Sequence, residues 1–170
     1  IMMHEVASRL QLDIELTTPE SLHEHPLYND APIAVKFVNR VPEESFMNFV
    51  ITLKDNNSVL LSNFNVMGEK HNSRSITAKL GQEVKTPAGL IKIEATPMFK
   101  EWPVGTEITL RKYPLSSVGK MYAGRLSVGL SDKDATIIQL TLTDEVPQRA
   151  EDVLLTLIDV YNEQWVKDKN

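Results

Sequence analysis

The sequence predicts an α+β domain in which helices from both chain ends enclose a β-rich middle. Apolar residues recur at helical spacing near the N-terminus and again over the last third of the chain. Between these regions, apolar and polar residues alternate in short runs that are separated by Pro, Gly and Asn turns. We therefore expect residues 1–17 and 110–170 to form a base, which is a small mixed sheet covered by helices. Residues 32–110 are expected to form a β-rich insertion within the same domain.

The composition is that of a folded globular protein. The chain has 170 residues, of which 42% are hydrophobic and 24% are charged, so it can bury a core and is not disordered throughout. The net charge of −5 argues against a nucleic-acid partner, which requires a basic face. Cysteine is absent, which excludes disulfides, thiolate catalysis and Cys-ligated zinc. No apolar run approaches the roughly 18 residues of a membrane span, and no signal peptide pattern is present.

The N-terminal residues predict a short helix and then a strand. The helix positions that should face the core are Met3, Val6, Ala7 and Leu10. Leu12, Ile14 and Leu16 then alternate with acidic residues, as in a half-buried strand. Residues 17–32 contain three prolines, which predicts a loop.

The middle of the chain predicts strands that are joined by turns. Alternating apolar residues mark strands within residues 33–37, 47–53, 91–95 and 108–110. The polar run at residues 55–58 predicts a turn, so residues 46–64 are expected to form a hairpin. Residues 65–75 are polar and aperiodic, which predicts a mobile loop.

The last third predicts a helix, a strand and a second helix. The first of these helices begins near Pro114 and extends to Leu126. Its core-facing residues are Leu115, Val118, Tyr122 and Leu126. After residues 127–130, an acidic turn at residues 131–134 leads to a strand at residues 136–143. The residues of this strand expected to be buried are Ile138, Leu140 and Leu142.

The final helix has the longest apolar stripe of the chain. Asp144 and Glu145 precede it, where negative charge stabilises a helix N-terminus, and Pro147 stands in its first turn. The residues of the stripe are Ala150, Val153, Leu154, Leu157, Ile158, Tyr161 and Trp165. Leu155 and Val166 lie off the stripe and are candidates for contact with another subunit. Single exposed apolar residues are also common on monomeric proteins.

The sequence assigns no catalytic or cofactor-binding residue. A phosphate loop is excluded because Gly119-Lys120 is followed by Met121, where Ser or Thr is required. Neither a dinucleotide-binding fingerprint nor a nucleophile elbow is present. We therefore expect no nucleotide and no other cofactor to bind this chain.

The sequence likewise assigns no metal site. His23, Glu24 and His25 have the spacing of ligands on a strand, but solvated loop histidines are the better interpretation because no third ligand is near in sequence. Asp132 and Asp134 resemble the start of a calcium loop, but the Gly and Glu that complete such a loop are missing. A surface turn is the better interpretation here as well.

The order of several segments is that of a known periplasmic domain. The segments are residues 108–115, the helix that follows them, residues 137–144 and residues 147–162. In this order the chain resembles the polysaccharide co-polymerases. This family contains the chain-length determinants of O-antigen and capsule, and the bacterial tyrosine kinases that share their periplasmic fold. The opening helix and the Leu-Asp-Ile strand at residues 12–14 are similar to the family's start, and residues 81–112 resemble the β-rich portion of its kinase-linked members.

The resemblance implies a non-catalytic periplasmic scaffold that belongs to an inner-membrane protein of a Gram-negative bacterium. Such a protein regulates the chain length and export of capsular polysaccharide or exopolysaccharide, and a cytoplasmic tyrosine kinase accompanies it in the kinase-linked members. The implied partners are further copies of the same protein, the polysaccharide, and the polymerase and export machinery. We expect this chain to be part of a longer protein. Without the membrane anchors that concentrate it, the chain should associate weakly in dilute solution.

Two other interpretations remain open. In the first, the chain is a carbohydrate-binding module in which Trp102 and Tyr113, together with Phe99, line one exposed face and stack on sugar rings. Two aromatic residues separated by a turn more often pack locally. In the second, the chain is a small glycosidase, which requires two carboxylates facing each other across a cleft. Glu43-Glu44 is an acidic pair, but no partner group distinguishes it from surface residues.

Overall fold

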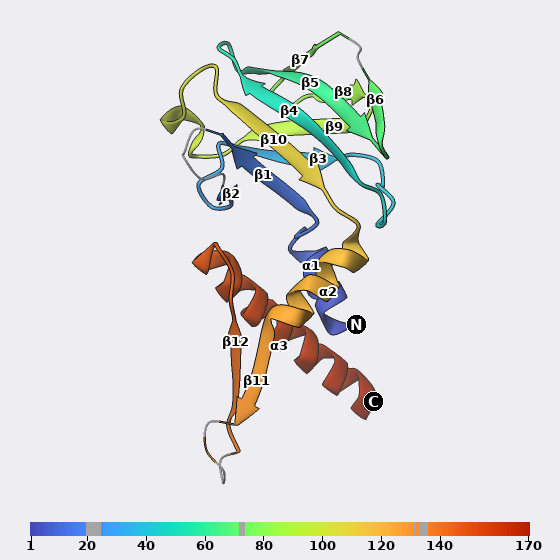
Figure 1. The fold of residues 1–170 in the computed structure, drawn as a ribbon, viewed down its shortest axis with the longest axis vertical. Helices are drawn as coiled ribbons and strands as arrows, with labels where there is room; N and C mark the ends of the chain where they lie inside the picture. Colours follow the sequence, from blue (N-terminus) through green and yellow to red (C-terminus); the bar gives the residue numbers. More distant parts are fainter. Residues whose placement is uncertain (20–24, 72–73, 131, 133–135) are drawn as a thin grey trace. The chain divides into compact units, whose positions relative to one another are not determined.

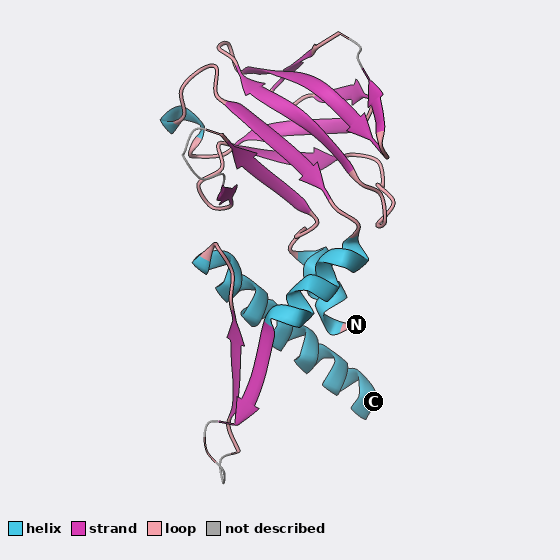
Figure 2. Cartoon of the chain, in the orientation of Figure 1, coloured by secondary structure: helices cyan, strands magenta, loops and turns pink. Residues whose placement is uncertain are grey.

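The computed structural model describes residues 1–19, 25–71, 74–130, 132 and 136–170, and the chain forms two compact units (Figure 1). The helical unit comprises residues 1–13 and 115–170, and the sandwich unit comprises residues 14–114. Helices come from both chain ends, and antiparallel strands make up the middle of the chain (Figure 2). The predicted α+β class with a β-rich middle is confirmed.

The sandwich unit contains two sheets. The seven-stranded sheet has the order β2 (His25–Leu27), β1 (Ile14–Thr18), β10 (Glu107–Lys112), β4 (Met47–Leu53), β5 (Ser58–Val66) and β6 (Glu69–His71), and β7 (Ile76–Lys79) also pairs with β5. The three-stranded sheet has the order β3 (Ile33–Phe37), β9 (Gly89–Ala95) and β8 (Glu83–Thr86). A short 3-10 turn, η1 (Phe99–Glu101), precedes β10. All strand pairs in both sheets are antiparallel.

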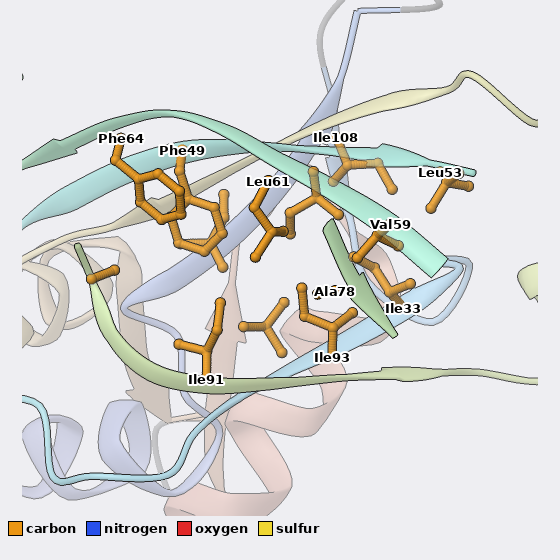
Figure 3. Close-up of a cluster of buried hydrophobic side chains, with 14 of the residues drawn as sticks. Ile33, Phe49, Leu53, Val59, Leu61, Phe64, Ala78, Ile91, Ile93 and Ile108 are labelled. Atoms are coloured by element: carbon orange, nitrogen blue, oxygen red, sulfur yellow. The ribbon is translucent and has the colours of Figure 1, made fainter. Parts of the chain in front are cut away.

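The core of the sandwich unit lies between these sheets (Figure 3). The alternation predicted for residues 47–53 holds, because each odd-numbered residue of β4 is buried. Phe49 stacks on Phe64 of β5, and their ring centroids are 4.7 Å apart. Ile91 and Ile93 of β9 contribute to the core from the three-stranded sheet and are also buried. The alternating apolar pattern is therefore explained by burial of one face of each sheet.

The first and last long strands of the sandwich unit are neighbours. β1 pairs with β10, and Ile14 stands opposite Lys112. The sequence analysis placed the early strand in the base, but β1 begins at Ile14 and extends the seven-stranded sheet instead, where Leu16 opposes Leu110. Alternation identifies a strand without selecting its partner. The boundaries of the two units accordingly fall at residues 13/14 and 114/115.

Residues 65–75 were predicted to be a loop, and this prediction is wrong for most of them. β5 continues to Val66, Met67 and Gly68 form a tight turn, and β6 follows at Glu69–His71. The φ angles of Met67 and Gly68 are 53° and 82°. Positive φ at both central residues is what a type I′ hairpin turn requires. Residues 72–73 of the predicted loop lie outside the described residues.

The helical unit packs three helices beside a two-stranded hairpin. The elements are α1 (Met2–Arg9), α2 (Leu115–Arg125), β11 (Leu126–Leu130), β12 (Ile138–Leu142) and α3 (Pro147–Lys169). The buried residues of its core are Met3, Val6, Ala7, Leu12, Leu115, Val118, Tyr122, Val153 and Val160. Gly119 permits a close approach of two helices, because a Cβ at this position would lie 3.2 Å from the Cα of His4. The predicted core faces of the first two helices are confirmed.

The predicted stripe of the final helix is only partly correct. Val153 is buried, but Ile158, Tyr161 and Trp165 are exposed, and Val160 is buried in their place. The first part of the stripe is packed, since Val153 is buried and Leu157 packs against the same core, whereas its last three residues are exposed.

The two-stranded hairpin also differs from the prediction. Residues 127–130, which were not assigned to a strand, belong to β11 and pair with β12. Ile138, predicted to be buried, is 63% exposed, whereas Leu140 and Leu142 are partly buried. The hairpin is a separate two-stranded sheet, so the end that carries Ile138 gains no burial from a larger sheet.

Candidate functional site

Most of the large apolar side chains that are exposed within the described residues belong to the helical unit. On α3, the exposed apolar residues are Leu155, Ile158, Tyr161, Trp165 and Val166, which we call the α3 surface. On the hairpin and its connection, the exposed apolar residues are Val128, Leu130, Ile137 and Ile138. Scattered apolar residues are normal on a protein surface, but residues that gather on one element indicate an interaction site.

The predicted subunit contacts, Leu155 and Val166, both belong to the α3 surface. Their exposed fractions are 55% and 54%, and they lie eleven residues apart, which is about three helical turns. Ile158, Tyr161 and Trp165 extend this surface, although the sequence analysis assigned them to the core. The ammonium of Lys169 lies 4.1 Å from the ring centroid of Trp165 and partly covers it. Five apolar residues therefore share the exposed part of one long helix.

A buried ion pair fixes which face of α3 is turned outward. Arg149, in the first turns of α3, donates from Nε to Asp144 Oδ2 at 2.8 Å and from Nη2 to Asp144 Oδ1 at 2.6 Å. The Tyr122 hydroxyl donates to Oδ2 at 3.1 Å, and the Val146 N–H donates to Oδ1 at 3.1 Å. The Asp144 side chain is fully buried. This network holds the start of α3 to α2 with a rotation that leaves the α3 surface uncovered.

The network also sets the protonation of its members. Burial of Asp144 acts to raise its pKa, but the hydrogen bonds from Arg149, Val146 and Tyr122 outweigh burial, and the pKa lies below its usual value. Burial raises the pKa of the Tyr122 hydroxyl, and the nearby Asp144 raises it further. At neutral pH the pair is therefore a carboxylate and a guanidinium, and a neutral phenol donates a further hydrogen bond to the carboxylate. The sequence analysis placed Asp144 at a helix N-terminus, and the structure adds Arg149 and Tyr122 as its partners.

A second, exposed ion pair joins the first and last helices. Arg9 of α1 donates to Glu163 of α3, with 3.1 Å between Nη1 and Oε1, and its Nε donates to Glu5 at 3.0 Å. The hydrogen bond from Arg9 lowers the pKa of Glu163. The two ends of the sequence thus pack side by side in one unit.

The residues proposed for saccharide stacking do not lie together. Trp102 precedes β10, its Nε1 donates to the Asp30 carbonyl oxygen at 3.0 Å, and its ring packs against the sandwich core. Phe99 packs against the same core, whereas Tyr113 follows the opposite end of β10 and is 39% exposed. β10 itself has six residues and is roughly 20 Å long, and Trp102 and Tyr113 lie beyond its opposite ends. These side chains do not line one exposed face.

The described residues contain no arrangement that suggests metal chemistry. No group of three or more His, Asp or Glu side chains within them is placed to hold a metal ion. His23, Glu24 and Asp134 lie outside the described residues, as does the side chain of His25. Among the described helices, none is both long enough and apolar enough to cross a membrane.

Comparisons with known proteins do not identify the chain. No protein-family model matches it, and no curated protein is significantly similar in sequence. Its function must therefore be inferred from its own side chains and from the order of its elements.

Proposed function

We propose that this chain is the periplasmic part of a polysaccharide co-polymerase. In this proposal it is a non-catalytic scaffold of an inner-membrane protein that regulates the chain length and export of capsular polysaccharide or exopolysaccharide. A kinase-linked parent, with a cytoplasmic tyrosine kinase, fits the resemblance of residues 81–112. The observation that carries the proposal is the packing of α1 against α3 in one α/β unit, with the whole sandwich unit inserted between them in sequence. This agrees with the expectation from the sequence that both chain ends form one base around a β-rich insertion.

The α3 surface supports an assembly of several copies. A ring requires a heterologous contact, in which one patch of a subunit meets a different patch of its neighbour. Leu155, Ile158 and Trp165 offer an apolar patch of this kind, because each of them is about half exposed. The polymer and the polymerase and export machinery would then be partners of the assembly as a whole.

The proposal is tested in the source bacterium with the full-length gene. We expect deletion of the gene to abolish the modal length distribution of one surface or secreted polysaccharide on a gel, and the wild-type gene to restore it. The double substitution Leu155→Asp and Val166→Asp should not restore it, because it places two charges in the proposed contact. Gln164→Glu is the matched control, since it adds a charge at an exposed polar position of the same helix. An unchanged polysaccharide in the deletion strain would refute the proposal.

The carbohydrate-binding alternative is separated by titration. The sandwich unit contains Trp102, so a sugar that stacks on it should change its fluorescence in a saturable way. The scaffold proposal expects no saturable change with fragments of the exported polymer. Saturation that disappears in Trp102→Phe would favour the carbohydrate-binding module instead.

A further inference from the structure

The sandwich unit contains an open pocket at one end of its two sheets. Its volume is about 470 Å³, within the range of roughly 300–1,000 Å³ that is typical of ligand sites. Three separate stretches of chain line it: residues 37–47, Val66 with Met67, and residues 87–90. All of them belong to the sandwich unit. We call this the intersheet pocket.

The floor of the intersheet pocket is apolar. Met47 and Ala88 are buried, and Phe37, Val66 and Leu90 are partly buried. Met47 and Val66 stand opposite each other on β4 and β5, next to the stacked Phe49 and Phe64. The floor therefore continues the core beyond the last aromatic pair. The polar residues of the lining are Asn39, Arg40, Glu44 and Ser45, and all four come from the loop between β3 and β4.

This loop is held in place by a buried lysine. The ammonium of Lys112 donates to the carbonyl oxygens of Glu43, Ser45 and Tyr113 at 3.1, 3.2 and 3.1 Å. The Ser45 hydroxyl also donates to the Pro42 carbonyl oxygen at 2.7 Å. A loop fixed by these bonds keeps its shape without a ligand, so little ordering is required on binding.

Met67 stands at the mouth in an uncommon backbone conformation. Its φ of 53° is in the left-handed region, which residues other than Gly, Asn and Asp seldom adopt. Its N–H donates to the Phe46 carbonyl oxygen at 2.9 Å, and its sulfur accepts the Phe46 N–H at 3.3 Å. The Met67 side chain is nevertheless 56% exposed. The backbone of Met67 is thus held at the entrance. Its exposed side chain is apolar and flexible, so it can adapt to an aliphatic ligand.

The rim carries a cation, Arg40, that is exposed to solvent. Within the described parts of the chain, no hydrogen-bond or ion-pair partner is found for Arg40. Glu44, the acidic residue of the lining, already interacts with other groups of the protein. An anion at the rim would therefore find Arg40 available.

We propose that the intersheet pocket binds a monomeric amphiphile, which is one aliphatic chain that ends in a carboxylate or phosphate. The chain would lie on the floor formed by Met47, Val66 and Ala88, and the anion would pair with Arg40. A sugar ring is a poorer fit, because hydroxyl groups on the floor would lack polar partners. This inference is independent of the scaffold role and of the α3 surface.

Methyl resonances of methionine provide the test. The protein has six methionines, and two of them, Met47 and Met67, line the pocket. With ¹³C-methyl methionine, dodecanoate or dodecyl phosphate below its micelle concentration should shift these two resonances in a saturable way. The resonances of Met2, Met3, Met98 and Met121 should not move. Shifts at all six positions, or at none, would overturn the proposal.

Two variants test the two halves of the site. Arg40→Gln should weaken dodecanoate binding by about tenfold, the loss expected for a charge-assisted hydrogen bond, whereas Lys54→Gln removes an exposed charge outside the lining and should have no effect. Ala88→Leu should abolish binding by filling the floor, while Ala95→Leu, at an exposed position of β9, should not. The spectrum of each variant reports whether it is folded.

The remaining outcomes also decide the question. Dodecyltrimethylammonium should bind at least about tenfold more weakly than dodecanoate, because its charge is opposite. Equal affinity for the two would remove the role of Arg40 and overturn the proposal. Shifts that appear only with phosphatidylglycerol vesicles, and never with monomers, would also overturn it, because they would identify a membrane surface as the ligand.

Discussion

The two units of this chain differ in how completely they bury their apolar side chains. The sandwich unit places the apolar faces of its sheets against each other, so that Phe49, Ile93 and Ile108 are almost completely buried. The helical unit buries Val153 and Val160 but leaves Ile158 and Trp165 of the same helix in solvent. The sandwich unit therefore buries most of its large apolar side chains within its own core. The helical unit leaves several of them exposed on α3, where a partner can bind.

Among the substitutions that test this difference between the units, the largest loss of stability is expected in the sandwich core. Phe49→Ala should lower the free energy of unfolding of the sandwich unit by about 3–5 kcal/mol, because the cavity removes the contacts with Phe64. Denaturant titration followed by Trp102 fluorescence in a Trp165→Phe background measures this unit alone. Val104→Ala, at an exposed position of the same unit, should change the value by less than about 0.5 kcal/mol. Similar losses in both variants would mean that the sandwich is not a closed core.

A comparable effect in the helical unit depends on charge rather than packing. Asp144→Ala should cost about 3 kcal/mol, because it leaves Arg149 buried without its carboxylate. Helical circular dichroism during denaturation measures this loss. Asp144→Asn is the matched control: it keeps the shape and an acceptor for Val146, so its cost should be smaller.

The same carboxylate predicts an acid sensitivity of the helical unit. The pKa of Asp144 is lower in the folded state than in the unfolded state, so the unfolded chain takes up the proton first as the pH falls. The stabilisation is therefore complete above about pH 5 and is lost as the pH falls through the folded pKa. Denaturation at pH 7 and pH 3 should show a larger loss in the wild type than in Asp144→Asn. Equal losses would show that other carboxylates, such as Glu163, dominate.

A smaller effect distinguishes two glycines of α2. A Cβ on Gly124 meets open space, so Gly124→Ala should stabilise the helix by up to about 1 kcal/mol. A Cβ on Gly119 would lie 3.2 Å from a backbone atom of α1, which cannot move aside as a flexible side chain can. Gly119→Ala should therefore gain nothing and lower the melting temperature. If both substitutions stabilise the unit, the two helices are less closely packed than we infer.

The smallest effect is expected at the α3 surface itself. Ile158→Ser combined with Trp165→Ser should change the free energy of unfolding by less than about 0.5 kcal/mol in dilute solution, because both side chains are already exposed. Light scattering should give a monomer for both proteins at low concentration. A loss above about 2 kcal/mol would instead show that these residues are covered within the folded monomer.

The sequence predicted the main strands of the sandwich core and the hairpin of β4 with β5, but it missed the short strands β2, β6, β7 and β8. Alternation identifies β4 and β10 because each has one buried face, and this pattern lies within a few consecutive residues. The pairing of β1 with β10 brings together residues far apart in sequence, and no local pattern specifies it. β11 was missed although Leu126, Val128 and Leu130 alternate with Ser127 and Gly129, because Leu126 was assigned to the preceding helix.

The candidate site was predicted in part for the same reason. Leu155 and Val166 were identified because they depart from the apolar stripe, but a helix with two apolar faces does not indicate which one its neighbours will cover. The ion pair of Asp144 and Arg149 settles that choice, and the five-residue separation of these two residues gave no signal of it. The intersheet pocket was not predicted at all, because three distant stretches of chain form it.

The pairing of β1 with β10 has a consequence for how this protein can change over evolution. Since Ile14 stands opposite Lys112, the sandwich begins and ends at adjacent points, and its removal would leave only a short gap to bridge. The sandwich unit could therefore be replaced during evolution by a larger or smaller domain, or by one with different loops, while the helices that flank it in sequence stay unchanged.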